Sequence, residues 1–152
     1  MKSINDLNRL DCEVSERIKS SVMHCLESGW YVLGQNVSTF ENKFSMYIGT
    51  KYAVSVANGT EALEIAMRAI GVSVGDEVIT VANAGFYSSF GILACGAKPV
   101  YADIDLKTYT MDVESFKLNI SSRTKAVIFT HLYGMIGDID KIVAICREKN
   151  IL

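Results

Sequence analysis

The 152-residue sequence has little proline, no paired cysteine motif and no long apolar run, and each absence excludes a class of protein. A single proline, with a hydrophobic fraction of 49%, argues against a disordered chain and indicates one packed domain. Cys12, Cys25, Cys95 and Cys146 include no CxxC motif, which indicates reduced and buried thiols. Since no stretch approaches the ~20 apolar residues of a membrane span and the N-terminus lacks the apolar core of a signal peptide, we expect a soluble cytoplasmic protein.

Charge and motif content exclude further classes. Fifteen Lys and Arg residues stand against 17 Asp and Glu residues without a dense basic run, so a nucleic-acid partner is not expected. The sequence has neither a GxGxxG motif nor a Walker lysine, which argues against dinucleotides and ATP as ligands. His, Cys and carboxylate residues show no metal-ligand spacing, so no metal is expected.

Strand-like and helix-like segments alternate along most of the chain. Apolar residues at helical spacing predict two amphipathic helices before residue 50, and strands rich in Val and Ile alternate with helices afterwards. This order predicts the α/β class, with a mainly parallel sheet and helices on both faces. The expected strands cover residues 52–57, 76–82, 98–104 and 125–130.

Four loops follow these strands, and ligands of such sheets bind at the carboxyl ends of the strands. The loops carry residues 58–61, 83–89, 103–105 and 131–134. In the first, Gly59 lets a ligand approach the backbone, and the start of the next helix offers free amides to a phosphate. Asn58 followed three residues later by Glu61 also forms a capping box, which needs no ligand. Both interpretations remain open from spacing alone.

The other loops give no clearer signal of a ligand. Phe86 could stack on a flat ligand, but the pattern alone favours a core aromatic that closes the sheet. His131 could be an acid, a base or a structural residue, and Asp103 and Asp105 are more typical of turns than of catalysis. Spacing thus predicts a fold and a ligand face but no reaction.

Three segments of the sequence closely resemble one family, and the resemblance runs from about Gly29 to Leu152. They read "WYVLGQNVSTFENKFSMYIGTKYAVSVANGTEALEIAMRAIGVSVGDEVIT", "GAKPVYADIDLKTYTMDVESF" and "RTKAVIFTHLYGMIGDIDKI". The chain resembles the N-terminal half of the DegT/DnrJ/EryC1/StrS sugar aminotransferases. The resemblance implies the N-terminal part of the large domain of aspartate-aminotransferase-type enzymes, with pyridoxal 5'-phosphate (PLP) as cofactor. It also implies amino transfer, usually from glutamate, to a keto group of a nucleotide-linked sugar, in a homodimer or higher oligomer.

The resemblance also implies roles for single residues. The cofactor phosphate would lie at the "NGT" turn, the cofactor ring on the aromatic side chain after "NAG", and the substrate entrance near "LGQN". Gly85 occupies a position where many relatives have a threonine, so one polar contact is missing. The implied cofactor residues are Gly59, Thr60, Glu61, Phe86 and His131, and the implied substrate residue is Gly34.

The resemblance implies that the chain is incomplete. Residues 1–50 would form an N-terminal helical segment, and residues 51–152 part of the PLP-binding domain. The resemblance places the Schiff-base lysine of relatives beyond Leu152. Lys98 and Lys125 begin expected strands, and Lys141 and Lys149 lie on an expected helix, so none of the four is expected to replace it. We therefore expect no catalytic residue in this chain and no activity from it alone.

Three alternatives remain at this stage. One is a sugar dehydratase of the same family, in which histidine replaces the lysine. Another is a binding or interaction domain without turnover, and the third is a Rossmann nucleotide-sugar-binding domain. The sheet order of the family would keep the second, third and fourth expected strands together and leave the first without its neighbour, so we expect association through exposed edges or apolar helix faces.

Overall fold

The computed structural model describes residues 11–152. The N-terminal stretch on which the expectation about a signal peptide rests lies partly outside the described residues. The chain divides into two compact units between Ser55 and Val56, here called unit 1 and unit 2. The functional boundary expected at residue 50 stays a prediction.

Unit 1 contains two helices, both of which were predicted. Helix α1 spans Cys12–Ser28 and α2 spans Gln35–Ile48. The Asp11 carboxylate caps α1 by accepting a hydrogen bond from the amide of Glu13 at 2.8 Å. Gly29 and Gly49 end the helices in the left-handed region, with φ of 66° and 79°, which glycine adopts without steric cost.

Helix α1 carries an apolar stripe that unit 1 does not cover. Val14, Ile18, Val22 and Leu26 recur at helical spacing and are 41 to 54% exposed. No residue of α1 is buried. The stripe confirms the predicted amphipathic pattern, and its apolar side chains are exposed within unit 1.

The prediction of a strand at residues 52–57 is wrong. Tyr52–Ala57 joins no sheet among the described residues, and Tyr52 and Val54 are 73% and 79% exposed. The amide of Ser55 donates to the Glu41 carboxylate at 2.7 Å. A strand needs a neighbour to accept its amides, and here a side chain takes that place.

Unit 2 is built on a parallel sheet of three strands. Strand β1 spans Glu77–Val81, β2 spans Lys98–Ala102 and β3 spans Thr124–Val127. Their order is β2-β1-β3, and both pairings are parallel. The expected class is confirmed, as is the expectation that these three strands stay together.

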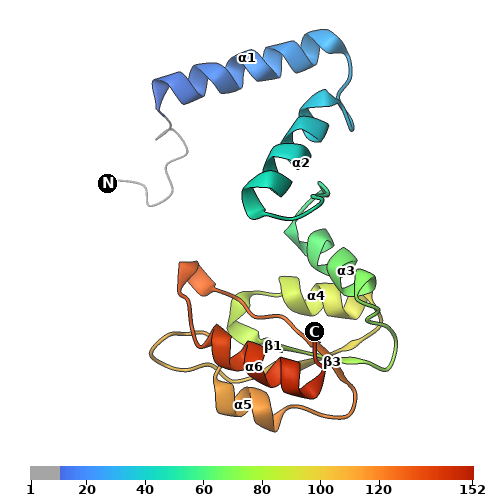
Figure 1. Ribbon diagram of the computed structural model, residues 1–152, viewed down its shortest axis with the longest axis vertical. Helices are drawn as coiled ribbons and strands as arrows, with labels where there is room; N and C mark the ends of the chain where they lie inside the picture. Colours follow the sequence, from blue (N-terminus) through green and yellow to red (C-terminus); the bar gives the residue numbers. More distant parts are fainter. Residues whose placement is uncertain (1–10) are drawn as a thin grey trace. The chain divides into compact units, whose positions relative to one another are not determined.

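Helices cover both faces of this sheet, as predicted (Figure 1). Alternate residues of β1 divide the core: Val78 packs with α3 and α4, whereas Ile79 and Val81 pack with α5 and α6. The short 3-10 turns η1 and η2 follow β1 and β3. The elements are α3 Gly59–Ala69, η1 Ala82–Ala84, α4 Tyr87–Ala94, α5 Val113–Leu118, η2 Leu132–Gly134 and α6 Ile139–Lys149.

The cysteines differ in their surroundings. Cys95 and Cys146 are buried as expected, and burial raises the pKa of the Cys146 thiol. Cys12 is exposed at the first residue of α1, so the expectation of a buried thiol is wrong there. Among residues 11–152, no helix combines the length and the apolar character needed to cross a bilayer.

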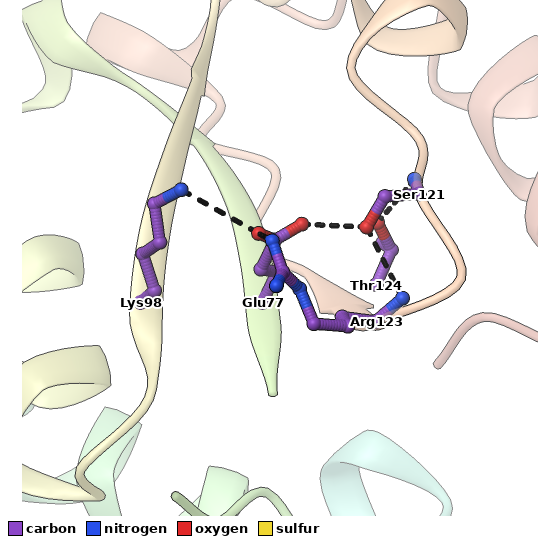
Figure 2. Close-up of polar contacts among 5 residues, drawn as sticks. All are labelled: Glu77, Lys98, Ser121, Arg123 and Thr124. Carbon is purple, nitrogen blue, oxygen red and sulfur yellow. Dashed lines mark hydrogen bonds and ion pairs between the residues drawn. The ribbon is translucent and has the colours of Figure 1, made fainter. Parts of the chain in front are cut away.

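A buried carboxylate ties the three strands together at their amino ends (Figure 2). Glu77 of β1 is 4% exposed and accepts hydrogen bonds from Ser121 Oγ and Arg123 Nη2, both at 2.6 Å. Lys98 Nζ of β2 lies 3.5 Å from the same carboxylate. The Ser121 bond, followed by the Arg123 bond, holds the pKa of Glu77 below its ordinary value.

This lowered pKa predicts a contribution of Glu77 to stability that depends on pH. The contribution is complete above the unfolded-state pKa of about 4.3 and is lost as pH falls through the lower folded-state pKa. Glu77→Gln should therefore lower the melting temperature at pH 7 and weaken its fall between roughly pH 5 and pH 3. Glu114→Gln, which alters an exposed pair with Lys117, is the control and should leave the pH profile unchanged. Identical profiles for Glu77→Gln and the unmodified chain would refute the assignment.

Thr80 of β1 is fully buried. Among the described residues, its hydroxyl oxygen is the one buried side-chain nitrogen or oxygen atom without a hydrogen-bond partner. Such a group costs about 1–3 kcal/mol, so the near-isosteric Thr80→Val should raise the free energy of unfolding by about 1 kcal/mol. Thr124→Val is a matched control on β3, because Thr124 Oγ1 accepts from the amide of Ser121 at 2.9 Å. It should destabilise the chain. Urea unfolding measures both, and a destabilised Thr80→Val would show that the hydroxyl has a partner.

Candidate cofactor site

The turn before α3 forms a variant of the predicted capping box, in which Glu61 binds the amide before the N-cap residue Asn58. Asn58 Oδ1 accepts from the amide of Glu61 at 2.9 Å, and Glu61 Oε2 accepts from the amide of Ala57 at 2.7 Å. The structural interpretation of this motif is therefore confirmed. It also shows that the amide and the carboxylate of Glu61 are already engaged.

The box leaves the first two amides of α3 without a partner. Neither Gly59 N nor Thr60 N donates a hydrogen bond within residues 11–152. A Cβ built on Gly59 would meet nothing within 4 Å, so open space lies in front of this backbone. Two free amides at the positive end of an 11-residue helix suit a phosphate.

Helices α3 and α4 form one layer. A Cβ at Gly91 of α4 would lie 2.9 Å from Met67 Cε and 3.3 Å from the amide of Glu64, so glycine permits the close approach of the two helices. Arg68 Nη2 of α3 donates to the carbonyl of Ala94 at 2.6 Å. The starts of both helices, which carry the predicted cofactor residues, thus belong to one packed layer.

Phe86 lies at the start of α4, after the carboxyl end of β1. Its side chain is 62% exposed, so the core interpretation is wrong and the ring is available to a flat ligand. Gly85 precedes it with φ of 77°, and a Cβ there would lie 2.7 Å from Tyr87 Cε2. This backbone favours glycine, which explains why threonine would not fit at this position.

His131 follows β3 and begins η2. Its ring is exposed and lies 5.1 Å from that of Phe129, tilted by 59°. It is accessible, and its role stays a prediction.

The loop after β2 is ordered by its own aspartate. Asp105 Oδ1 accepts from the amides of Lys107 and Thr108 at 2.8 and 2.9 Å. The Thr108 bond, followed by the Lys107 bond, lowers the pKa of Asp105. The turn role expected for Asp105 is confirmed.

Sequence reasoning missed a groove of about 810 Å³ on the other face of the sheet. It lies between the loop after β2, the start of α5 and α6, and mixes apolar residues such as Met111 and Ile145 with acidic and basic ones. Lys107 lines it and is a lysine that follows the carboxyl end of a strand. Because Lys107 stands two residues after "ADID", at the end of an expected strand, the sequence could have predicted a lysine at this edge of the sheet.

Gly34 begins α2 in unit 1 and is buried. A Cβ there would lie 3.0 Å from the carbonyl of Trp30, so glycine allows a close backbone approach. Its predicted place near a substrate entrance stays a prediction. Across residues 11–152, no three His, Cys, Asp or Glu side chains form a group that could hold a metal ion.

Free amides at the start of α3 and an exposed aromatic ring after β1 are features suited to a phosphate-bearing planar ligand at the carboxyl end of a parallel sheet. Residues 12–152 match the DegT/DnrJ/EryC1/StrS aminotransferase family, and the chain belongs to that family. Its fold is that of the N-terminal part of the large domain of aspartate-aminotransferase-type enzymes.

Two curated relatives and one solved structure illustrate the likeness. The dTDP-3-amino-3,6-dideoxy-alpha-D-galactopyranose transaminase of Aneurinibacillus thermoaerophilus is 40% identical over 96% of this chain and 40% of its own length. The UDP-2-acetamido-2-deoxy-3-oxo-D-glucuronate aminotransferase of Pseudomonas aeruginosa is 39% identical over 96% of this chain and 41% of its own length. The solved structure of NtdA from Bacillus subtilis, with the bound cofactor pyridoxamine 5'-phosphate (PMP), is 26% identical in sequence. Its TM-score is 0.87, and the match covers 99% of this chain and 37% of the NtdA chain. The chain thus spans about 40% of the curated relatives.

Proposed function

We propose that this chain is the N-terminal, cofactor-binding part of a PLP-dependent nucleotide-sugar aminotransferase. The observation that carries the proposal is the pair of unbonded amides at Gly59 and Thr60, in a chain of this family. Because the capping box engages Glu61 without using these amides, the turn is already ordered before a phosphate arrives. This preorganisation lowers the cost of binding.

Different residues of unit 2 bind different parts of the proposed cofactor. Gly59 and Thr60 hold the phosphate through their amides and the Thr60 hydroxyl, while Glu61 keeps the turn in shape. Phe86 stacks on the pyridine ring. His131 can donate or accept a proton at the rim of the site. When bound, PLP supplies the electron sink that amino transfer requires.

The substrates proposed here are a nucleotide-linked keto sugar and an amino donor such as glutamate. The names of the two curated relatives support a sugar linked to dTDP or UDP. Because the chain spans only about 40% of these relatives, the activity is proposed for a longer protein, as is a homodimer or larger oligomer. That protein should convert glutamate to 2-oxoglutarate and add an amine to the sugar, as mass spectrometry would show. A product that loses a hydroxyl without gaining an amine would identify a dehydratase instead.

This chain by itself should not form a specific covalent bond with PLP. Lys98 begins β2 at the amino edge of the sheet, Lys125 lies near the start of β3, and Lys141 and Lys149 lie on α6. Lys107 follows the carboxyl end of β2, but it lines the groove on the other face of the sheet from α3 and α4. Borohydride reduction with PLP followed by peptide mapping should therefore label no lysine stoichiometrically. Stoichiometric labelling of one lysine would contradict the proposal, and Lys107 is the residue to inspect first.

A further inference from the structure

The loop that carries Phe86 is bonded to the neighbouring loop through one side chain. Asn83 of η1 donates from Nδ2 to the carbonyl of Tyr109 at 2.9 Å. Asn83 follows β1 and Tyr109 belongs to the loop after β2, so the bond joins two loops at the carboxyl edge of the sheet. The two residues are 26 positions apart in the sequence, so this is a long-range bond and not part of a local turn.

The accepting loop is a well-ordered support. The Asp105 carboxylate accepts hydrogen bonds from the amides of Lys107 and Thr108. The amide of Tyr109 donates to the backbone carbonyl of Asp105 at 2.8 Å. Ile104 and Met111 then close the loop as an antiparallel bridge. Tyr109 itself has φ of 55°, a left-handed conformation that aims its carbonyl.

The donating loop has less to hold it. Among the described residues, Ala82, Asn83 and Ala84 form one turn of 3-10 helix, and Gly85 follows with φ of 77°. Asn83 and Gly85 are exposed, and Ala84 between them is the one residue of residues 82–86 that packs against the core. A displaced loop would carry the exposed Phe86 ring with it.

We propose that Asn83 is a positioning residue that holds the Phe86 ring where it can stack on a planar cofactor. This inference rests on the proposed function, because the ligand of Phe86 is the PLP ring. Asn83 acts through the backbone of residues 82–86 and does not touch the cofactor. The Asn83 amide therefore contributes to affinity only as long as Phe86 is present.

The test uses the variant Asn83→Asp, which keeps the shape and replaces the donor by an acceptor facing a carbonyl. Asn119→Asp is the matched control, since Asn119 Nδ2 also donates to a carbonyl, that of Ser115 at 2.8 Å, at the end of α5. Losing one such bond is worth about 1 kcal/mol, so amide exchange at residues 82–87 should rise about fivefold in Asn83→Asp and stay unchanged in the control. Unchanged exchange in Asn83→Asp overturns the inference, and no cofactor is needed to see it.

The second readout is a double-mutant cycle with pyridoxamine 5'-phosphate (PMP), which has no aldehyde to react with lysines. Asn83→Asp should weaken PMP binding about three- to tenfold and should have no further effect in a chain that already carries Phe86→Ala. Additive effects would overturn the positioning role. An unmodified chain that binds PMP no better than pyridoxamine would instead contradict the proposed function, while raised exchange would still support the coupling of the loops.

Discussion

Thr60→Asp should abolish tight binding of PMP without unfolding the chain. The new carboxylate would lie beside the free amides at the start of α3, where the phosphate is proposed to bind. Like charges in contact cost several kcal/mol, so the affinity should fall at least about 100-fold. The same carboxylate is favourable at a helix N-terminus, so the stability of α3 should not fall.

This substitution separates the two interpretations of the turn. If Asn58 and Glu61 form only a capping box, Thr60→Asp leaves every measured property nearly unchanged. Thr60→Ser is the matched control: it keeps the hydroxyl and should bind PMP within about threefold of the unmodified chain, since surface changes of this kind are small. Calorimetric titration measures both variants. Equal affinities of Thr60→Asp and Thr60→Ser for PMP would show that the phosphate does not bind at the start of α3.

Phe116→Ala should destabilise unit 2 by about 3–5 kcal/mol. Phe116 of α5 is fully buried and packs in a cluster with Ile79 of β1 and Ile142 of α6. A loss of this size is a large fraction of the 5–15 kcal/mol that typical domains have. Urea unfolding followed by circular dichroism measures it.

Leu118→Ala is the control on the same helix. Leu118 is 86% exposed, so its removal should change stability by less than about 0.5 kcal/mol. A loss below about 1 kcal/mol for Phe116→Ala would mean that α5 does not close the core on this face.

The elements that carry local signals were predictable. Gly29, Gly49 and Gly71 end their helices at positive φ, and Asp112 caps α5 by accepting from the amide of Ser115 at 2.7 Å. Caps and apolar periodicity act within a few residues, so the sequence shows them directly. The first expected strand failed for the opposite reason. Val54 and Val56 favour a strand, but a strand also requires a distant partner that periodicity does not reveal.

The candidate site was predictable to the level of loops and not of contacts. The residues after each strand were known to share an edge once the sheet was parallel. The exposure of Phe86, the engagement of Glu61 and the bond from Asn83 to Tyr109 depend on backbone turns far apart in the chain. Asp105 shows the limit: its turn role was expected, whereas its support of a neighbouring loop was not.

The most direct measurement of the central claim compares two ligands on the unmodified chain, PMP and pyridoxamine, by calorimetric titration. They differ only in the phosphate that Gly59 and Thr60 are proposed to hold. Two charge-assisted hydrogen bonds are worth about 1.5 kcal/mol or more each, so PMP should bind at least about 100-fold more tightly. Equal affinities for the two ligands would contradict the assignment of the start of α3 as the phosphate site.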